Sequence, residues 1–394
     1  MDKDPVLPLR GPQDDGKAIT ILGSTGTIGQ NTLKIIASHP GRFQLAALTA
    51  GNNVALLAEQ AKKFRPRRAV IANTALYGEL KELLQGSDVE AAAGDDAVCE
   101  AAAMPSDVVM SAIVGAAGLK PTLAAIRSGA TVALANKECL VCAGALMTKE
   151  VKKYGATLIP VDSEHNGIFQ LFDFDHPERI ESVTITASGG PFREFTLEQM
   201  RGVTPQQAVK HPNWNMGAKI SVDSATLMNK GLELIEAFYL FPLRPEQLKV
   251  LIHPQSIVHC LVQMIDGSVL AQMSLPDMCT PIAHALAWPE RIEAPVKKLD
   301  LAAIGNLQFE TPDTKRFPAL RIARDALVAG GNAPTVLNAA NEIAVSRFLR
   351  SELGFLDIVK IVEKTLETVD NVPLETIDDV LACDRAARQF AENI

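Results

Sequence analysis

From residue 18 to about residue 160, short apolar runs alternate with segments of helical periodicity, and this alternation constrains the fold more than any other feature. Runs typical of strands occupy residues 18–22, 43–48, 68–71, 108–111, 131–134 and 157–160. Helical apolar spacing occupies residues 31–38, 53–64, 75–84 and 119–128. Such alternation is typical of βα units and a parallel sheet. We therefore expect an α/β fold with an N-terminal Rossmann-like, doubly wound parallel sheet.

The remainder of the chain has a different pattern. Strand-like runs at residues 183–186, 250–252, 257–264 and 268–273 are not separated by regular helices. Asp266-Gly267 is a strong hairpin signal between the last two runs. Helical periodicity returns at residues 321–328, 336–349, 356–369 and 377–392. We expect a central α+β domain with a mixed sheet, followed by a C-terminal helical bundle.

Composition and charge narrow the class of protein. The chain has 394 residues, of which 47% are hydrophobic and 21% charged, which is typical of a folded globular protein with two or three domains. Its net charge of -8 argues against binding to nucleic acid or an anionic membrane. No apolar run reaches membrane-spanning length, and residues 1–17 lack the apolar region of a secretory signal. We expect a disordered arm at residues 1–17 and a cytoplasmic protein.

The six cysteines are scattered along the chain, which predicts reduced thiols rather than a disulfide framework. Cys139 and Cys142 form a CxxC pair. Because no second pair completes four metal ligands, we interpret this pair as structural.

The first predicted strand leads directly into Gly23-Ser-Thr-Gly26-Thr-Ile-Gly29 and then into a helix. Glycines at such a turn let the backbone approach a pyrophosphate, which a helix N-terminus also attracts. The GxxGxxG spacing is only moderately specific, and a plain tight βα turn is the alternative. The second strand is followed by Asn52 and Asn53, with no carboxylate to repel a 2′-phosphate and no Lys or Arg to attract one. This favours NADP over NAD.

Three carboxylates are candidate metal ligands. Asp162 and Glu164 follow a predicted strand, and in extended geometry residues two apart point to one side. Glu233 is the third candidate, and oxygen ligands suit Mg²⁺ or Mn²⁺ better than zinc. A solvated strand end is the alternative for the first pair. His165 is interpreted as structural.

Small hydrogen-bonding groups are dense at residues 187–191, 222–226 and 229–231, which suits a phosphate dianion, although each segment alone is also an ordinary turn. Trp214 lies in a polar segment, where it either covers a ligand or anchors the loop in the core. Lys137 follows the strand at residues 131–134, at the edge where such sheets contact ligands.

Eight motifs together carry a family resemblance: Gly-Ser-Thr-Gly-Thr-Ile-Gly, Ala-Asn-Lys-Glu, Pro-Val-Asp-Ser-Glu-His-Asn, Ser-Gly-Gly-Pro-Phe-Arg, His-Pro-Asn-Trp, Ser-Val-Asp-Ser-Ala-Thr, Met-Asn-Lys-Gly-Leu-Glu and His-Pro-Gln-Ser. In this order, covering nearly the whole chain, they resemble the 1-deoxy-D-xylulose 5-phosphate reductoisomerase family. The resemblance implies a V-shaped homodimer that rearranges and reduces this sugar phosphate to 2-C-methyl-D-erythritol 4-phosphate, the committed step of non-mevalonate isoprenoid precursor biosynthesis. It implies NADPH and Mg²⁺ or Mn²⁺, with Co²⁺ as a further option. The expected domains are NADPH-binding (18–160), catalytic and dimerising (161–290), a linker (291–320) and a helical bundle (321–394).

The resemblance also assigns residues. The metal ligands implied are Asp162, Glu164 and Glu233, and with Lys137 they form the expected catalytic set. The substrate site implied comprises Lys137, Ser163, Glu164, Ser188, His211, Trp214, Ser224, Asn229, Lys230 and Glu233, of which Ser188, Ser224, Asn229 and Lys230 take the phosphate. The NADPH site implied comprises Gly23, Thr25, Gly26, Thr27, Ile28, Gly51, Asn52, Asn53, Asn136, Glu138, Met216 and Gly217.

Several positions depart from the family pattern. Asn52 stands where many members carry Lys, which weakens the expected attraction for the 2′-phosphate. Ala187 replaces a glycine, and Cys139 and Cys279 stand where Ser and Arg are expected. Two other readings stay open: another metal-assisted NAD(P)-dependent dehydrogenase, and a non-catalytic dinucleotide sensor. The dehydrogenase would need an Arg clamp for its substrate carboxylate, and Arg193 alone lies near the candidate loops.

Overall fold

The computed structural model describes residues 16–214 and 216–394, so most of the expected N-terminal arm lies outside the described residues. Contacts within the chain divide it into two compact units. The first contains the described residues up to 139, with Met147–Asn166 and Met278–Val296. The second contains Leu140–Leu146, Gly167–Asp277 and Lys297–Ile394.

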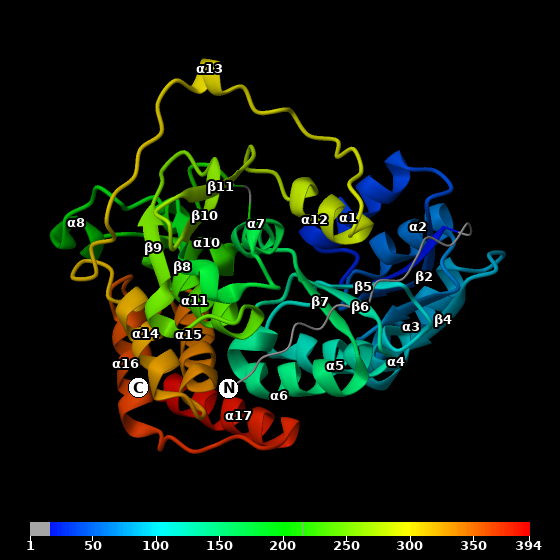
Figure 1. Ribbon diagram of the computed structural model, residues 1–394. Coiled ribbons are helices and arrows are strands. Elements are labelled where there is room, and N and C mark those ends of the chain that lie inside the picture. Colours follow the sequence, from blue (N-terminus) through cyan, green and yellow to red (C-terminus); the bar gives the residue numbers. More distant parts are fainter. Residues whose placement is uncertain (1–15, 215) are drawn as a thin grey trace. The chain divides into compact units, whose positions relative to one another are not determined.

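The first unit is built on a seven-stranded parallel sheet (Figure 1). Its strands are β1 (Lys17–Leu22), β2 (Phe43–Ala50), β3 (Arg68–Ile71), β4 (Glu90–Ala93), β5 (Val108–Ser111), β6 (Thr131–Leu134) and β7 (Thr157–Pro160). Their order is β4-β3-β2-β1-β5-β6-β7, so the winding direction reverses between β1 and β5. Ligands of doubly wound sheets bind at such a switch point, beyond the carboxyl ends of the strands. All six expected strands are confirmed. β4 was not expected, because its sequence Glu-Ala-Ala-Ala lacks β-branched and aromatic residues.

Helices follow most of these strands. Four of them were expected from the sequence: α1 (Thr27–Ser38), α2 (Val54–Phe64), α3 (Tyr77–Leu83) and α5 (Leu119–Arg127). Three others were not among the expected helices: α4 (Asp95–Ala102), α6 (Glu138–Tyr154) and α7 (Ser163–Leu171), which begins in this unit. A later helix, α12 (Cys279–Ala287), returns to pack against α1 and β6. Lys17 Nζ donates to the carbonyl oxygens of Ala287 (3.1 Å) and Trp288 (2.8 Å), which caps the end of α12 with a positive charge.

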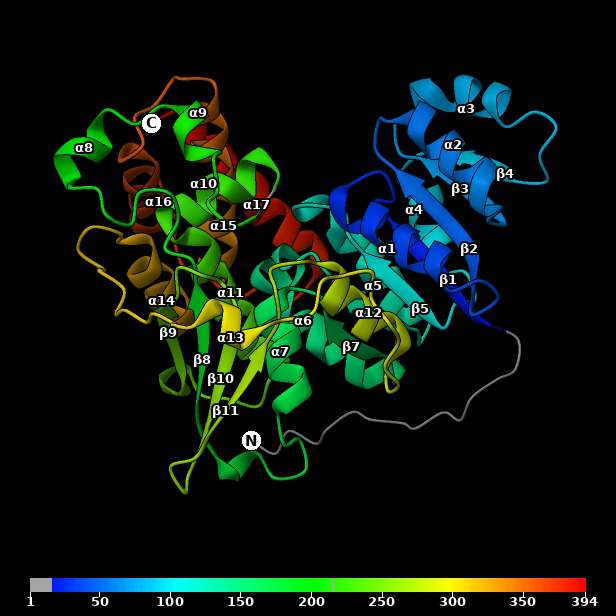
Figure 2. The same ribbon diagram turned by 90° about the horizontal axis from the view of Figure 1, so that it is seen from above.

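The second unit contains a four-stranded mixed sheet, which Figure 2 shows from above. Its strands are β8 (Ile180–Ala187), β9 (Leu248–Ile252), β10 (Val258–Met264) and β11 (Val269–Met273), in the order β11-β10-β8-β9. Only the β8 and β9 pair is parallel. The expected hairpin is confirmed: Gly267 has a φ of 88° and the backbone N–H of Ser268 donates to Asp266 Oδ1 at 2.9 Å.

The expected helical bundle forms the C-terminal part of this unit. Its helices are α14 (Ala319–Ala329), α15 (Ala333–Leu349), α16 (Asp357–Thr368) and α17 (Ile377–Glu392). Two further helices, α10 (Ala218–Thr226) and α11 (Met228–Leu240), share one apolar core with the bundle. Gly231 of α11 lies so close to α14 that a Cβ there would be 2.5 Å from Ala323 Cβ. The candidate phosphate residues on α10 and α11 are therefore supported from behind by the bundle.

The connection between sheet and bundle is mostly irregular. The short helices α8 (Leu197–Arg201), α9 (Pro205–Ala208) and α13 (Leu301–Ile304) interrupt the loops of this unit. Ile252 at the end of β9 pairs with Glu310 in an isolated antiparallel bridge, which anchors the expected linker (residues 291–320) to the sheet.

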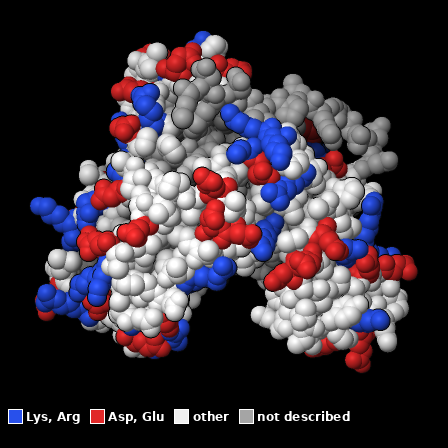
Figure 3. Space-filling model, turned by 90° about the horizontal axis from the view of Figure 1, so that it is seen from below, with Lys and Arg blue, Asp and Glu red and all other residues white. Residues whose placement is uncertain are grey.

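The face of the molecule in Figure 3 carries charges of both signs. On the face that Figure 3 shows, Lys and Arg side chains lie among Asp and Glu side chains. None of the helices in the described ranges combines the length and the apolar composition that a membrane span needs. No disulfide joins the six cysteines, all of which lie in the described ranges.

Candidate active site

The glycine-rich loop after β1 approaches its neighbours too closely for side chains. Gly23 has a φ of 84°, and a Cβ there would lie 2.7 Å from the carbonyl oxygen of Ala112. A Cβ on Gly29 would lie 2.4 Å from the carbonyl oxygen of Gly23. Gly26 takes the N-cap position of α1 without a side-chain hydrogen bond to the first turn. Gly26 and Thr27 at the start of α1 are exposed, so the first N–H groups of this helix are available to a phosphate.

The end of β2 presents Gly51, Asn52 and Asn53, all exposed. Asn53 Oδ1 accepts from the backbone N–H of Leu56 at 3.2 Å and so caps α2. Asn52 Oδ1 accepts from Asn73 Nδ2 at 3.0 Å. Both amides thus have local partners and shape the loop beside the switch point.

Lys137 and Asp162 meet at the carboxyl ends of the neighbouring strands β6 and β7. Lys137 Nζ lies 2.5 Å from Asp162 Oδ2, and only 7% of the Lys137 side chain is exposed. Asn136, which precedes the lysine, is buried and donates from Nδ2 to the carbonyl oxygen of Gly115 at 3.0 Å. Asn136 therefore positions the loop after β5. Glu138, also buried, begins α6.

One geometric prediction is wrong at this edge. Residues 162–164 are not extended, because α7 begins at Ser163 and the carbonyl oxygen of Asp162 accepts its hydrogen bond from Asn166 N at 2.8 Å. Glu164 lies in the first turn of this helix, and Ser163 Oγ donates to Glu164 Oε2 at 2.7 Å. A carboxylate at the start of a helix is stabilised by the helix dipole, which accounts for the helical start that strand periodicity did not reveal.

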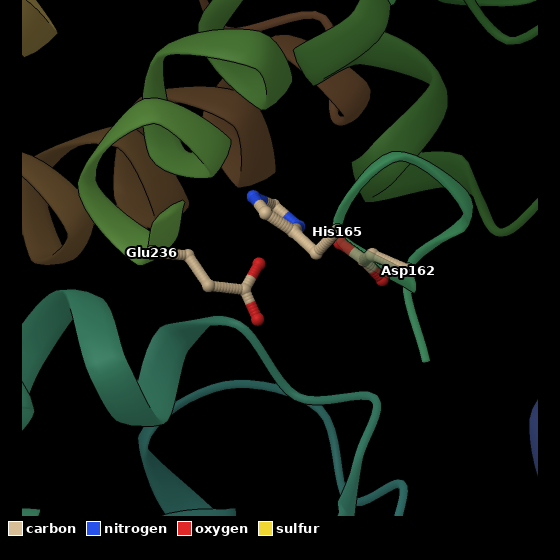
Figure 4. A group of neighbouring side chains, drawn as sticks. All are labelled: Asp162, His165 and Glu236. Carbon is tan, nitrogen blue, oxygen red and sulfur yellow. The ribbon is translucent and has the colours of Figure 1, made fainter. Parts of the chain in front are cut away.

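His165 is fully buried in α7, and one of its ring nitrogens lies within 4.8 Å of an Asp162 carboxylate oxygen. Figure 4 shows these two side chains and that of Glu236. Glu236 belongs to α11 in the second unit and is also fully buried. Sequence reasoning did not select Glu236, and its only signal is its spacing of three residues from Glu233 on the same helix.

In the second unit, α11 carries Asn229, Lys230 and Glu233 on successive turns. Asn229 Nδ2 donates to Glu233 Oε1 at 2.5 Å, and Lys230 Nζ forms an ion pair with Glu233 Oε2. Lys230 and Glu233 are both buried, with 3% and 2% of their surface exposed. A buried carboxylate needs a cation beside it, and here the lysine provides one.

The loop after β8 packs against the end of α10. Gly190 has a φ of 71°, and a Cβ there would lie 2.8 Å from the carbonyl oxygen of Ser224 and 2.9 Å from Ala225 Cα. Its backbone N–H donates to Ser188 Oγ at 3.1 Å. The structure thus brings Ser188 and Ser224 to one place, although 36 positions separate them in the sequence.

His211 connects the following loop to Ser188. Its Nε2 lies 2.9 Å from Ser188 Oγ, and its Nδ1 accepts from the backbone N–H groups of Asn213 (3.1 Å) and Trp214 (3.0 Å). Burial lowers the pKa of His211 to about 4. Trp214 is only partly buried, with its ring 6.4 Å from that of His259. Trp214 is therefore neither a fully buried anchor nor a fully exposed side chain.

The same segment ends at the start of α10. Met216 is partly buried, and Gly217 is exposed at the N-cap position of α10 without a side-chain cap. Met216 therefore lies directly before the uncapped N-terminus of α10.

Sequence reasoning missed a buried polar contact behind this site. Asp223 of α10 is 1% exposed; its Oδ2 lies 2.8 Å from Lys219 Nζ and its Oδ1 accepts from Asn341 Nδ2 at 2.7 Å. Asn341 belongs to α15 of the bundle, 118 positions away, so no local pattern could reveal this contact. The carboxylate joins α10 to the bundle.

The predicted residues thus divide between the two units. The first unit holds the glycine-rich loop, the asparagines after β2, and Asn136, Lys137, Glu138, Asp162, Ser163 and Glu164. The second unit holds Ser188, His211, Trp214, Met216, Gly217, Ser224, Asn229, Lys230 and Glu233.

Comparison with known proteins gives consistent results along the chain. Profiles of 1-deoxy-D-xylulose 5-phosphate reductoisomerase match residues 19–144, and those of its C-terminal domains match residues 158–241 and 273–390. A reductoisomerase of Rhodospirillum centenum is 56% identical over 390 residues, covering 99% of this chain and 97% of the relative. One from Zymomonas mobilis is 55% identical, with coverage of 94% and 96%.

Solved structures agree. The Zymomonas mobilis enzyme in complex with NADPH is 54% identical, covers 96% of this chain and 98% of its own, and superposes with a TM-score of 0.92. A reductoisomerase in complex with NADPH, fosmidomycin and magnesium is 43% identical with a TM-score of 0.91 and the same coverage. The chain therefore belongs to the 1-deoxy-D-xylulose 5-phosphate reductoisomerase family.

Proposed function

We propose that this chain converts 1-deoxy-D-xylulose 5-phosphate to 2-C-methyl-D-erythritol 4-phosphate with NADPH and a divalent metal, using the residues assigned above. Family membership supports the reaction. The observation that carries the residue assignment is the pairing of two carboxylates with buried lysines: the partly buried Asp162 with Lys137, and the buried Glu233 with Lys230. These are the groups that an oxygen-coordinated cation and a phosphorylated substrate need.

The donor set fits a hard metal ion. Asp162, Glu164 and Glu233 offer only carboxylate oxygens, which Mg²⁺ and Mn²⁺ prefer, and Co²⁺ also accepts. Each of the two lysine-paired carboxylates already has a cation within ion-pair distance, so each site tolerates positive charge. We assign all three carboxylates as metal ligands.

The metal and NADPH would supply part of the chemistry, and residues of the chain supply the rest. When bound, the metal polarises the ketone and the neighbouring hydroxyl of the substrate, and NADPH supplies the hydride. Lys137, directed by Asp162, and Ser163 orient the reacting carbons during cleavage and rejoining of the skeleton by a retro-aldol and aldol sequence. Trp214, in the loop that His211 fixes, excludes water from the reacting groups.

The phosphate is held in the second unit. Ser188 and Ser224 offer hydroxyl groups, and Asn229 and Lys230 lie in the first turn of α11, where N–H groups point toward an anion. A lysine at a helix N-terminus is repelled by the positive end of the helix dipole. A bound phosphate dianion is attracted to both and so offsets this repulsion.

The cofactor binds at the switch point of the first sheet. The loop of Gly23 to Gly29 takes the pyrophosphate, and Asn52 and Asn53 adjoin the ribose phosphate. Met216 would contact the nicotinamide, and Gly217 would lie beside the cofactor. Residues 18–160 form the NADPH-binding domain, residues 161–290 the catalytic and dimerising domain, and residues 321–394 a bundle that follows the 291–320 linker and packs against α10 and α11.

We also propose that the enzyme is a homodimer that works in the cytoplasm. The outer edge of the second sheet exposes Val269 (52%) and Leu270 (44%) on β11 and Ile265 (66%) beside it. Exposed apolar side chains on an edge strand favour pairing with another strand. Leu270→Lys is expected to shift the protein from dimer to monomer in size-exclusion chromatography, whereas Val328→Lys, at an exposed apolar site on α14, leaves the dimer intact. A monomeric parent protein would contradict the proposal.

The deciding experiment follows NADPH absorbance with 1-deoxy-D-xylulose 5-phosphate and Mg²⁺ or Mn²⁺, with NADH and a chelator as controls. We expect oxidation that requires the metal and prefers NADPH. Glu233→Gln is expected to lower turnover by at least about 100-fold, because it removes one metal ligand, while Glu246→Gln at an exposed position of the same unit changes nothing. If the chain were a dinucleotide sensor, Glu233→Gln would leave its NADPH response intact. Oxidation of a 2-hydroxy acid instead would favour the dehydrogenase.

A further inference from the structure

The His-Pro-Gln-Ser motif, residues 253–256, is the one motif of the eight to which the proposed function gives no part. It forms a β-turn directly after β9, in which the backbone N–H of Ser256 donates to the carbonyl oxygen of His253 at 3.0 Å. The backbone N–H of His253 donates to the carbonyl oxygen of Ala187 at 2.7 Å, which joins the turn to the end of β8. Ser256 has a φ of 53°, in the left-handed region. A residue with a Cβ stays in that region only where surrounding contacts hold it there.

The turn holds a short piece of the linker, residues 306–310, which we call the linker strap. Gln255 contacts the strap twice: its Oε1 accepts from the backbone N–H of Gln308 at 3.3 Å, and its Nε2 donates to the carbonyl oxygen of Asn306 at 3.2 Å. His253 Nδ1 lies 2.7 Å from the carbonyl oxygen of Gln308. A carbonyl oxygen can only accept, so Nδ1 carries the proton and donates it to the strap.

Stacking and a backbone bridge complete the contacts of the strap. The ring of Phe309 stacks on that of His253, with the centroids 4.7 Å apart and the planes at 16°. Ile252 and Glu310 exchange two backbone hydrogen bonds, of 2.8 and 2.9 Å. Phe309 is nevertheless 43% exposed, whereas His253 is fully buried. Phe309 therefore covers one face of a ring that otherwise lies inside the protein.

The same turn also holds the loop of Trp214. Asn213, which directly precedes the tryptophan, donates from Nδ2 to the carbonyl oxygen of Pro254 at 2.5 Å and to Ser256 Oγ at 2.9 Å. Both acceptors belong to the turn, so both would move if Ser256 left its left-handed conformation. Strap, turn and loop all lie in the second unit.

We propose that the linker strap is a positioning element for the loop of Trp214. Its contacts with Gln255 and with the ring of His253 hold the turn in its left-handed conformation, and the turn then anchors Asn213. Gln255 and Phe309 are therefore positioning residues that act through Asn213. Without the strap, substrate binding itself would have to order the loop, at a cost in affinity. The proposal rests on the proposed function only in taking the sugar phosphate as the ligand that the loop covers.

Fluorescence of Trp214 tests the anchor without turnover. The chain has two tryptophans, so Trp288→Phe leaves Trp214 as the only one. In this background, we expect Phe309→Ala and Gln255→Ala each to raise acrylamide quenching of Trp214 at least about 2-fold, because the loop opens more often. Leu301→Ala is the matched control, at an exposed apolar position of the same linker outside the strap, and should be quenched as the parent is.

Two outcomes of the quenching experiment would overturn the proposal. One is quenching at the parent level in the strap variants. The other is an equal rise in Leu301→Ala, because a general loosening of the chain would then explain the effect. Phe309 is exposed, so Phe309→Ala leaves the core intact and decides the question even if Gln255→Ala does not fold.

A double-mutant cycle tests whether the strap acts through Asn213. Asn213→Ala removes the amide that the turn holds, and it should raise the quenching of Trp214 as the strap variants do. In the Asn213→Ala background, Phe309→Ala should add less than about 1.3-fold, because the contacts through which it acts are already missing. If the two increases multiply, the strap does not act through Asn213 and the proposal is wrong.

Initial-rate kinetics separate this role from a general loss of stability. We expect Phe309→Ala to raise KM for the sugar phosphate about 5-fold and to leave kcat within about 2-fold, because the lost order weakens binding and not the closed state. Leu301→Ala should keep both parent values. A lower kcat with an unchanged KM would contradict the proposal. If the parent enzyme does not turn over the substrate at all, the proposed function fails, whereas the quenching of Trp214 still decides whether the strap anchors the loop.

Discussion

Gly190→Ala tests whether close packing of the Ser188 loop on α10 builds the phosphate pocket. The alanine Cβ would lie 2.8 Å from the carbonyl oxygen of Ser224 and 2.9 Å from Ala225 Cα. Both are backbone atoms, which no rotamer change can move, so the two segments must separate by about 0.6 Å to reach ordinary contact. Gly190 also has a φ of 71°, which costs an alanine about 1–2 kcal/mol.

The expected magnitude follows from these two terms. Overpacking of a close contact costs about 1–3 kcal/mol, so the unfolding free energy should fall by about 2–5 kcal/mol in all. Separation of Ser188 from α10 should also raise KM for the sugar phosphate at least about 10-fold, because displacements below 1 Å already weaken oriented binding.

Urea unfolding and initial-rate kinetics measure both effects. Gly202→Ala is the matched control, because Gly202 belongs to the same unit, has no atom within 4 Å of its Cβ position and does not need a positive φ. We expect the control to unfold at the parent midpoint or slightly above it. If Gly190→Ala behaved like Gly202→Ala in both assays, the packing of the loop on α10 would not determine the pocket.

Three further predictions concern other parts of the chain. Gly29→Ala, whose Cβ would lie 2.4 Å from a backbone oxygen, should abolish NADPH binding in fluorescence titrations, whereas Gly78→Ala in open space on α3 should retain it. Asn341→Leu removes the donor to the buried Asp223 carboxylate and should lower the unfolding free energy by about 1–3 kcal/mol; urea curves that overlay those of the parent would contradict that contact. Because the pKa of His211 is lowered in the folded state, the unfolded chain takes up a proton first as pH falls from about 6.5 to about 4, so stability should decrease over that range. In urea titrations at several pH values, the unfolding free energy of His211→Asn should fall less steeply with decreasing pH than that of the parent. Equal pH dependence in the two proteins would refute the lowered pKa of His211.

The sequence by itself determined the fold class, the strand positions and the metal and phosphate candidates. Strands β3, β5, β6 and β7 have the predicted bounds, because buried parallel strands are short apolar runs with clear breaks on both sides. β4 was not predicted, because its three alanines have low strand propensity. The helices α10 and α11 were not predicted either. Their Ser, Asp, Asn and Gly residues are typical of turns, and the sequence does not show the bundle against which these helices pack.

Only the tertiary structure decided which of these residues meet. The sequence suggested an extended Asp162–Glu164 pair, and the structure instead begins a helix at Ser163, which gives Asp162 the partner Lys137 from the neighbouring strand. Ser188 and His211, or Asp223 and Asn341, share no local pattern, because their contacts depend on how strands and helices pack over long separations. Periodicity describes one element at a time, whereas a hydrogen bond between elements exists only once both elements have packed.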